Sequence, residues 1–262
     1  MKKVVLLLSL LSAVACSTVP GTGRSQLNFM SSAQEMSLGA QSYRAMLKGE
    51  RVIKEGPDAK MVQEIGARIA KSAKDYLPQS DAAKFRWEFK LIDDKEMVNA
   101  WALPGGKTAV YTGLLAVTGD EDSLAIVMGH EVAHALAHHG AERMSQGVLM
   151  QIGMLGAAVS MRDMDYEDRT MIMAGLGLGI HLGVSLPFSR SHESEADEIG
   201  LMLAANAGYN PEAAIGLWER MGASGEEPPE WLSTHPNSDT RIENLRALMP
   251  KAMVLYRDAL VQ

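Results

Sequence analysis

The sequence predicts an α+β fold that is mostly helical, and three segments support this prediction. Residues 58–73 repeat apolar side chains every three or four positions, as an amphipathic helix does. Residues 85–92 alternate apolar with charged side chains, which is typical of a half-buried strand. Residues 120–144 then form one long predicted helix. Because the strands come before most of the helices and do not alternate with them, α+β architecture is favoured over α/β.

The remaining segments fit the same class. Residues 99–103 and 108–112 flank a Pro-Gly-Gly turn and predict a hairpin. Either Asp120 or Asp122 can cap the long helix, because a carboxylate accepts the free N–H groups of a first turn. Further helices are predicted over 31–48, 193–206, 211–221 and 238–249, the last capped by Ser238.

Composition limits the classes of function. The chain has 262 residues, 47% hydrophobic and 22% charged, as in an ordinary globular protein. We expect residues 31–262 to form a single domain. The net charge of −7 repels phosphate backbones, so no nucleic-acid partner is expected.

The N-terminus is typical of an export signal. Lys2 and Lys3 precede a short apolar run over residues 4–11, and the small residues 13–15 precede Cys16, the only cysteine. The apolar run is too short to span a bilayer. A chain without further cysteines suits an oxidising envelope compartment.

The residues around Cys16 resemble a lipobox, although Ala13 stands where leucine is usual. We therefore expect residues 1–16 to be a lipoprotein signal with a lipidated Cys16; the alternative is an ordinary cleaved signal. Ser17 after the cysteine, by resemblance to Gram-negative lipoproteins, implies a periplasmic protein anchored to the outer membrane. Residues 17–30 contain Pro, Gly and Ser without apolar periodicity and predict a tether.

Residues 147–188 contain two apolar runs separated by the charged stretch 162–169. The first run has about 15 residues and contains Gln151, which is shorter than the ~20 residues that a membrane span needs. The second contains His181 and several glycines, which weaken an isolated helix. Buried or cleft-lining helices are favoured here, and a membrane-inserted hairpin is the alternative.

The run His-Glu-Val-Ala-His over residues 130–134 predicts a metal site. Residues four apart lie on one face of a helix, so His130 and His134 direct two imidazoles to one point, as a tetrahedral zinc ion requires. Glu131 lies beside that point and can take a proton from zinc-activated water.

A third protein ligand is needed. The metzincin pattern is excluded, because Ala137 and Gly140 stand where that pattern needs glycine and histidine. On a continuous helix His138 lies ~12 Å from His130, beyond the reach of one ion. We therefore expect structural or surface roles for His138 and His139.

A carboxylate on a later helix is the alternative ligand. Glu193 and Asp197 are four apart and share a face, so either one can bind the metal while the other supports a ligand histidine. Glu195 lies on a different face of that helix and is expected to be a solvated acidic side chain.

Three segments together resemble the HtpX, BepA and CaaX-endopeptidase family of gluzincin peptidases: the HEVAH run, the distal segment SRSHESEADEIG and the segment NAWALPGGKTAVYTGLL. The matching pieces run from about residue 20 to 245. The resemblance implies a zincin-like gluzincin core and a small sheet whose edge strand faces the active-site helix. It also implies one zinc ion held by His130, His134 and Glu193, with Asp197 as support.

Thr234-His235-Pro236, followed by Arg241, is similar to the C-terminal H-P-x-x-x-x-R-I pattern of this family. The resemblance implies that His235 reaches the active site, where it stabilises the oxyanion or binds zinc reversibly in a closed state. Arg241 is expected to hold that loop by bonding carbonyls or a carboxylate. His181 and His192 are expected to be structural.

An exposed strand can bind an extended peptide through its backbone. We expect the strand with Asn99, Ala100, Trp101 and Ala102 to lie along the substrate, although Asn99 can equally be structural. The predicted function is zinc-dependent endopeptidase activity on unfolded or misassembled envelope proteins.

Two other functions remain open. The first is a chaperone or assembly factor for outer-membrane proteins, with a gated and rarely cutting zinc site, whose Met-rich residues 147–188 bind unfolded clients. The second is an integral membrane protease anchored by the same residues.

Overall fold

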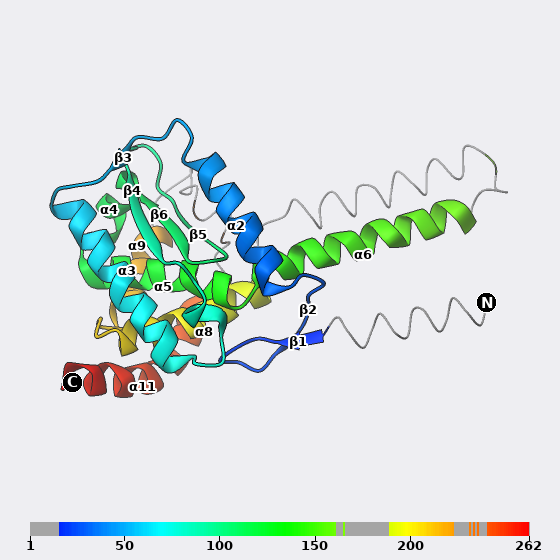
Figure 1. Ribbon diagram of the computed structural model, residues 1–262. Helices are drawn as coiled ribbons and strands as arrows, with labels where there is room; N and C mark the ends of the chain where they lie inside the picture. Colours follow the sequence, from blue (N-terminus) through cyan, green and yellow to red (C-terminus); the bar gives the residue numbers. More distant parts are fainter. Residues whose placement is uncertain are drawn as a thin grey trace.

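The computed structural model describes residues 16–160, 165, 189–222, 231, 233, 235 and 240–261. Within these residues the chain is mostly helical with a small mixed sheet, which confirms the α+β prediction (Figure 1). The predicted export signal before Cys16 lies outside the described residues, and so does His181.

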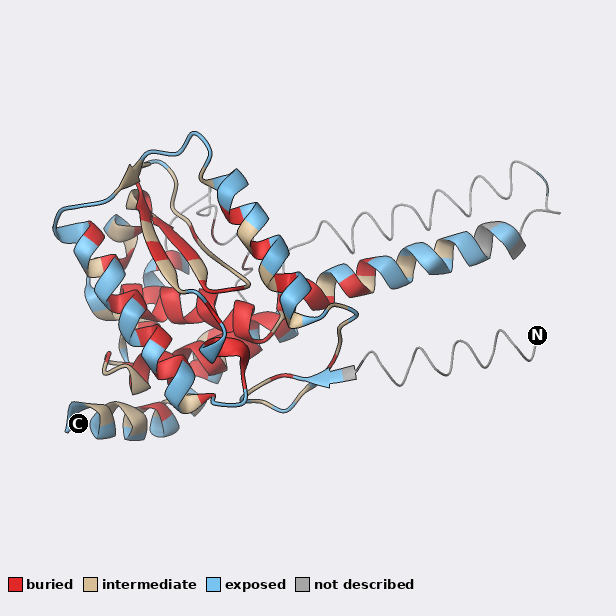
Figure 2. Ribbon diagram, in the orientation of Figure 1, coloured by how far each residue is buried: buried red, intermediate tan, exposed pale blue. Residues whose placement is uncertain are grey.

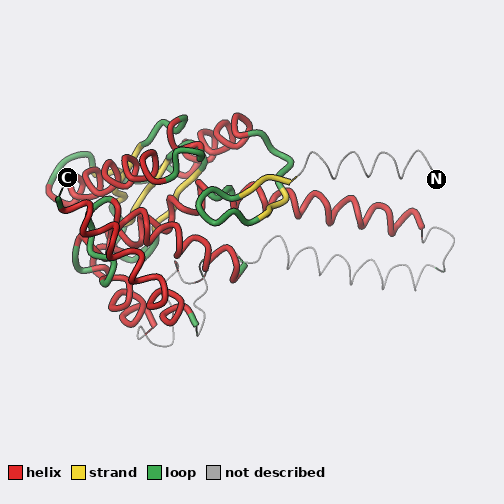
Figure 3. Tube along the Cα trace, turned by 90° about the horizontal axis from the view of Figure 1, so that it is seen from below, coloured by secondary structure: helices red, strands yellow, loops and turns green. Residues whose placement is uncertain are grey.

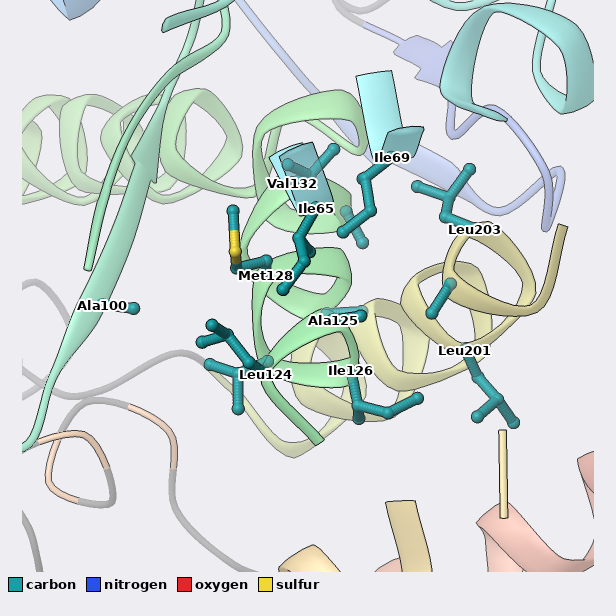
Figure 4. Packing of buried hydrophobic residues seen from close by; sticks show 14 of the residues in the cluster. Ile65, Ile69, Ala100, Leu124, Ala125, Ile126, Met128, Val132, Leu201 and Leu203 are labelled. Atoms are coloured by element: carbon teal, nitrogen blue, oxygen red, sulfur yellow. The ribbon is translucent and has the colours of Figure 1, made fainter. Parts of the chain in front are cut away.

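Three helices form the centre of the molecule: α3 (Pro57–Tyr76), α5 (Glu121–Leu136) and α8 (Arg190–Asn206). Figure 4 shows Ile65 and Ile69 of α3 beside the apolar side chains of α5, with Ala100 of the sheet on another side, and α8 packs along α5. Every residue of α5 from Ser123 to Leu136 is buried. The metal-motif helix is therefore the core element, enclosed by helices and sheet. The other helices are α2 (Ser32–Met46), the 3-10 helix η1 (Asp81–Ala83), α4 (Thr112–Thr118), α6 (His139–Ser160), α9 (Ala213–Gly222) and α11 (Arg241–Leu260).

The central sheet has the strand order β3-β4-β6-β5. β4 (Glu88–Ile92) and β6 (Lys107–Tyr111) are parallel, while β5 (Ala100–Leu103) is antiparallel to β6, as the predicted hairpin requires. The outer strand on the far side is β3 (Val52–Ile53). β5 is thus an edge strand, and it packs against α5.

The helix predicted over 120–144 is in fact two helices. Asp120 caps α5 by accepting from the Ser123 N–H at 2.7 Å, as expected. The helix ends at Leu136, and α6 begins at His139. Between them His138 has a φ of 58°, a left-handed conformation that interrupts the helix. Its ring is bound to Glu35 at 2.8 Å, which stabilises the break.

The two helices that carry the motifs touch through their backbones. A Cβ atom on Gly129 would lie 2.7 Å from the Gly200 carbonyl oxygen, and one on Gly200 would lie 2.7 Å from the His130 nitrogen. Glycine at both positions therefore permits an approach of α5 to α8 that any side chain would prevent.

Residues 17–30 do not form the expected tether. β1 (Cys16–Thr18) pairs with β2 (Ser25–Leu27), and we refer to residues 16–27 as the N-terminal hairpin. Val19 and Gln26 are buried, and Arg24 forms ion pairs with the body of the protein. These contacts offset the conformational entropy that the segment loses when it becomes ordered. Its composition alone did not predict such contacts.

The outer half of α6 is exposed, contrary to the prediction of buried or cleft-lining helices. The helix extends away from the body, and its outer residues are exposed (Figures 1 and 2). Among the described residues, no helix is long and apolar enough to cross a membrane. The whole second apolar run, residues 171–188, lies outside the described residues. The apolar side chains exposed on α6 are Met144, Val148, Leu149, Ile152, Leu155 and Val159.

The last helix differs from its predicted bounds. α11 begins after Thr240, which makes no side-chain cap bond, and the predicted cap Ser238 lies outside the described residues. The helix continues through Pro250 to Leu260, whereas the sequence predicts an end at residue 249. Its packing against α8 and α9 stabilises the helix beyond the proline. Figure 3 shows α11 beside the C-terminus.

Candidate metal centre and active site

Four side chains converge at one buried point: His130, His134, Glu193 and His235. One donor atom of each lies within 4.8 Å of the others. α5 supplies the two motif histidines and α8 supplies the glutamate, so the helical spacing and the distal carboxylate are brought together as predicted. His235 lies shortly before α11.

The spacing of these atoms suits a tetrahedral ion. Bonds of about 2.0–2.1 Å in a tetrahedron place the ligand atoms about 3.3 Å apart. The Nε2 atoms of His130 and His134 are 3.1 Å apart. The Glu193 oxygens lie 3.4 Å from His130 Nε2 and 3.3 Å from His134 Nε2. The three residues therefore fit a metal ion without rearrangement of the fold.

His130 is supported by a carboxylate, as the ExxxD spacing implies. Its Nδ1 lies 2.9 Å from Asp197 Oδ1, which also accepts from Arg241 Nη2 at 2.6 Å. Burial opposes a charge on the ring, but hydrogen bonds to Asp197 and Glu193 raise the pKa of His130 to about 9. Without a metal, Asp197 and Glu193 thus favour a second proton on the His130 ring. A bound metal ion can supply the positive charge in place of that proton.

His134 is supported differently. Its Nδ1 lies 2.8 Å from Nδ1 of His139, the first residue of α6, and His139 Nε2 lies 3.0 Å from Glu195 Oε2. His139 is fully buried, and burial lowers its pKa to about 4. Burial likewise holds the pKa of His134 well below its ordinary value. Both rings are therefore neutral, as a metal-binding histidine must be.

The prediction of a solvated Glu195 is wrong. Its side chain is only 6% exposed, because the N-terminal hairpin covers it. Arg24 Nε donates to it at 2.8 Å, and the Thr22 hydroxyl donates as well. Burial would raise the pKa of Glu195, but the bonds from His139, Thr22 and Arg24 lower it to about 2.

Glu193 is held as a carboxylate. Burial would raise its pKa, yet bonds with His130, His134 and His235 keep it far below the ordinary range. If Nδ1 of each motif histidine carries its proton toward Asp197 or His139, both Nε2 atoms present lone pairs to each other at 3.1 Å. Two lone pairs and an anion around one point fit a cation between them.

His235 is the fourth donor at this point. Its Nδ1 lies 3.2 Å from His130 Nε2 and 3.1 Å from Glu193 Oε1. The neighbouring Trp231 donates its indole N–H to Glu131 Oε1 at 2.6 Å. Trp231 therefore covers the predicted base, and His235 lies against both the ligand set and Glu131, so the structure is a closed arrangement.

The predicted substrate strand lies at the edge beside α5. Ala100 is buried, while Trp101 and Ala102 are half-buried on β5. The Asn99 carbonyl accepts from the Tyr111 backbone N–H in the sheet, and the backbone N–H of Trp231 donates to the Val98 carbonyl at 3.2 Å. The residue that covers Glu131 thus also bonds the backbone next to the edge strand.

The other predicted residues have structural partners. Arg241 binds the Asp197 carboxylate, as expected, and its guanidinium lies 3.4 Å from the ring centre of Trp218. His192 is buried with Nε2 3.0 Å from Glu142 Oε2 and stacks on His139. His138 binds Glu35.

Trp231 and Arg24 were not predicted from the sequence. Trp231 lies outside the metal-binding motifs, and Arg24 lies in a segment of loop-like composition. A buried carboxylate at Glu195 would have required a basic partner, which was the only signal pointing to Arg24.

Known proteins match most of this chain. The profile of Peptidase family M48 matches residues 58–249. Mitochondrial metalloendopeptidase OMA1 of Saccharomyces cerevisiae is 30% identical over 255 residues, which cover 92% of this chain and 71% of that protein. Metalloendopeptidase OMA1 of Homo sapiens is 30% identical over 244 residues, 89% of this chain and 46% of that protein. The β-barrel assembly-enhancing protease of Escherichia coli is 27% identical over 244 residues, 89% of this chain and 47% of that protein.

Proposed function

The chain belongs to peptidase family M48 and is a metallopeptidase, and from that premise we propose that it is a zinc-dependent endopeptidase of the bacterial cell envelope. Its proposed substrates are unfolded or misassembled envelope proteins. The observation that carries the proposal is the tetrahedral spacing of His130, His134 and Glu193, with Glu131 next in the chain to the first of them.

His130, His134 and Glu193 would hold the zinc ion, which when bound supplies Lewis acidity that acidifies water and polarises a carbonyl oxygen. Glu131 takes the proton of the attacking water and delivers it to the leaving amine. His235 must leave the position it occupies here, and from beside the centre its ring then donates to the oxyanion. Asp197 and Arg241 keep His130 oriented during these steps.

Residues Asn99 to Ala102 are proposed to bind the substrate backbone. β5 is the edge strand of its sheet and packs against α5, so a peptide added to it would run past the metal site. Backbone pairing recognises extended chains without demanding a particular sequence, which suits unfolded substrates.

The proposed envelope location rests on the predicted export signal and on Cys16. A lipid on Cys16 would anchor the protein to the periplasmic side of the outer membrane. Replacing Cys16 by Ser should move the protein from the membrane fraction to the soluble periplasm. Retention in the membrane would favour the integral-membrane alternative, as would failure of protein lacking residues 1–16 to dissolve without detergent.

The test of activity uses the full-length chain, with zinc content and cleavage of unfolded casein measured together. Wild type should bind one zinc and cut. Glu131→Gln should keep zinc and lose cleavage, and Glu193→Gln should bind zinc weakly. Glu198→Gln is the matched control, because this residue lies on α8 and pairs with Lys251 away from the centre. Undiminished zinc in Glu193→Gln would mean that the third ligand is wrongly assigned.

A second candidate is an assembly factor whose zinc site rarely cuts. The closed arrangement favours it, since Trp231 binds the predicted base and His235 is the fourth donor at the metal site. The exposed apolar side chains of α6 would then bind unfolded clients. Folding assistance that survives Glu131→Gln would support this candidate. A large gain of cleavage in Trp231→Phe would instead support a gated protease.

A further inference from the structure

We propose that His139 is the positioning residue of His134, and that Glu195 and Arg24 orient it, so that the N-terminal hairpin is part of the metal-binding apparatus. The proposal rests on the proposed metal site. It adds an assignment for a histidine, a glutamate and an arginine that the metal motif itself does not contain.

The direction of the hydrogen bonds follows from the metal ligand. His134 can bind an ion through Nε2 only if its proton is on Nδ1. That N–H then donates to His139 Nδ1 at 2.8 Å. With its Nδ1 accepting, neutral His139 carries its proton on Nε2 and donates to Glu195 at 3.0 Å. A single arrangement of protons therefore satisfies both hydrogen bonds, from His134 to His139 and from His139 to Glu195.

Glu195 is in turn fixed from outside the two motif helices. Arg24 donates to it through Nε and clasps Glu142 through both terminal nitrogens, at 3.0 and 2.7 Å. Glu142 also binds His192, whose ring stacks on His139 with centroids 4.4 Å apart. His139 is therefore held at its edge by a carboxylate and on its face by a second imidazole.

This support makes His134 a better ligand. A hydrogen bond from Nδ1–H fixes the tautomer and the plane of the ring and increases the basicity of Nε2. Most ligand histidines donate directly to a carboxylate or carbonyl. Here the His139 imidazole lies between His134 and the Glu195 carboxylate, because the helix break at His138 places the start of α6 against His134.

The test compares zinc affinity in full-length variants, measured by competition with a chromophoric chelator, together with the visible spectrum of the Co²⁺-loaded protein. His139→Ala should weaken zinc binding by about 10–100-fold. His139→Asn should recover part of that loss, because an amide oxygen can accept the His134 proton. Arg24→Met should weaken binding by about three- to tenfold. Both His139 variants should shift the Co²⁺ bands.

Arg51→Met is the matched control for Arg24→Met. It removes an arginine from an exposed pair with Asp93, which lies by β3 and β4 and is outside the ligand set and its hydrogen-bond partners. Its zinc affinity should stay within about twofold of wild type, as expected for an exposed change outside the site. The proposal is overturned if His139→Ala and Arg24→Met bind zinc like wild type, or if Arg51→Met loses as much as they do. Failure of wild type itself to bind zinc would instead overturn the proposed function.

Discussion

The two motif histidines lie one turn apart on α5, yet the arginines that support them come from opposite ends of the described chain. His130 donates directly to Asp197, whose other partner is Arg241 at the start of the C-terminal helix. His134 reaches a carboxylate only through His139, and the arginine beyond it is Arg24 of the N-terminal hairpin. Arg241 is 2% exposed and Arg24 is 30% exposed.

The difference separates a rigid support from an adjustable one. The Asp197–Arg241 pair is part of the core, where α8 packs against α11. The Arg24 pairs depend on a short hairpin in which Ser17, Thr18 and Ser25 are exposed. We expect the first support to contribute more to both stability and metal affinity, and the second to make metal binding depend on how the N-terminal hairpin is held.

The largest contrast should be in stability. Arg241→Met would leave Asp197 and Glu193 buried without their cation and should cost about 3–5 kcal/mol. Arg24→Met leaves the buried carboxylates Glu142 and Glu195 without their arginine, but the cation is partly exposed and the loss should be smaller, about 1–3 kcal/mol. Urea denaturation of both variants measures the two losses. Equal losses would show that the hairpin is as integral to the core as α11.

Neutralising each carboxylate without changing its shape compares the two supports directly. Asp197→Asn acts one hydrogen bond from a ligand and should weaken zinc binding by about 100-fold, whereas Glu195→Gln acts two bonds away and should cost about tenfold. Chelator competition at fixed pH measures both constants. If Glu195→Gln has the larger effect, the support through His139 is the dominant one.

His138 forms an ion pair of its own with Glu35, next to the second support. Burial lowers its pKa, but the bond to Glu35 outweighs burial and leaves the pKa raised. The bond should therefore contribute up to about 1 kcal/mol below the unfolded pKa of ~6.5, and the contribution should vanish as pH rises through the folded pKa. The difference in unfolding free energy between wild type and His138→Asn should shrink from pH 5.5 to pH 9. A difference that grows with pH would contradict this assignment.

The smallest expected effect is the coupling between the supports. Because they act on different histidines, their zinc-binding free energies should add to within about 0.5 kcal/mol in the Asp197→Asn, Glu195→Gln double variant. A larger coupling would mean that strain passes from one ligand to the other. The same chelator competition, applied to the two single variants and the double variant, measures it.

Local patterns predicted the part of the site that depends on helical spacing. The four-residue spacing placed His130 with His134, and Glu193 with Asp197, because helix geometry alone decides it. The edge strand was predictable from its Pro-Gly-Gly turn. The Gly105 and Gly106 conformations, with φ of 92° and 78°, are those that a glycine turn allows.

The second support was not predictable, because each of its links is long-range. The left-handed His138 lies in an apolar stretch without glycine or proline just before it, so nothing marked the break. Glu195 was placed correctly on a different face from Glu193, but what covers that face comes from residues 22 and 24. Spacing gives a side chain's face on its own helix, while its surroundings depend on tertiary packing.

The crossing of Gly129 and Gly200 has a consequence for changing this enzyme. The histidines and the glutamate belong to separate helices whose separation is fixed where two backbones meet with no side chain between them. A methyl group at either glycine would force α5 and α8 apart, and the two histidines would move away from the glutamate. A design that transfers this metal site to another scaffold must therefore reproduce the glycine–glycine contact first, because the contact sets the distance between the ligands.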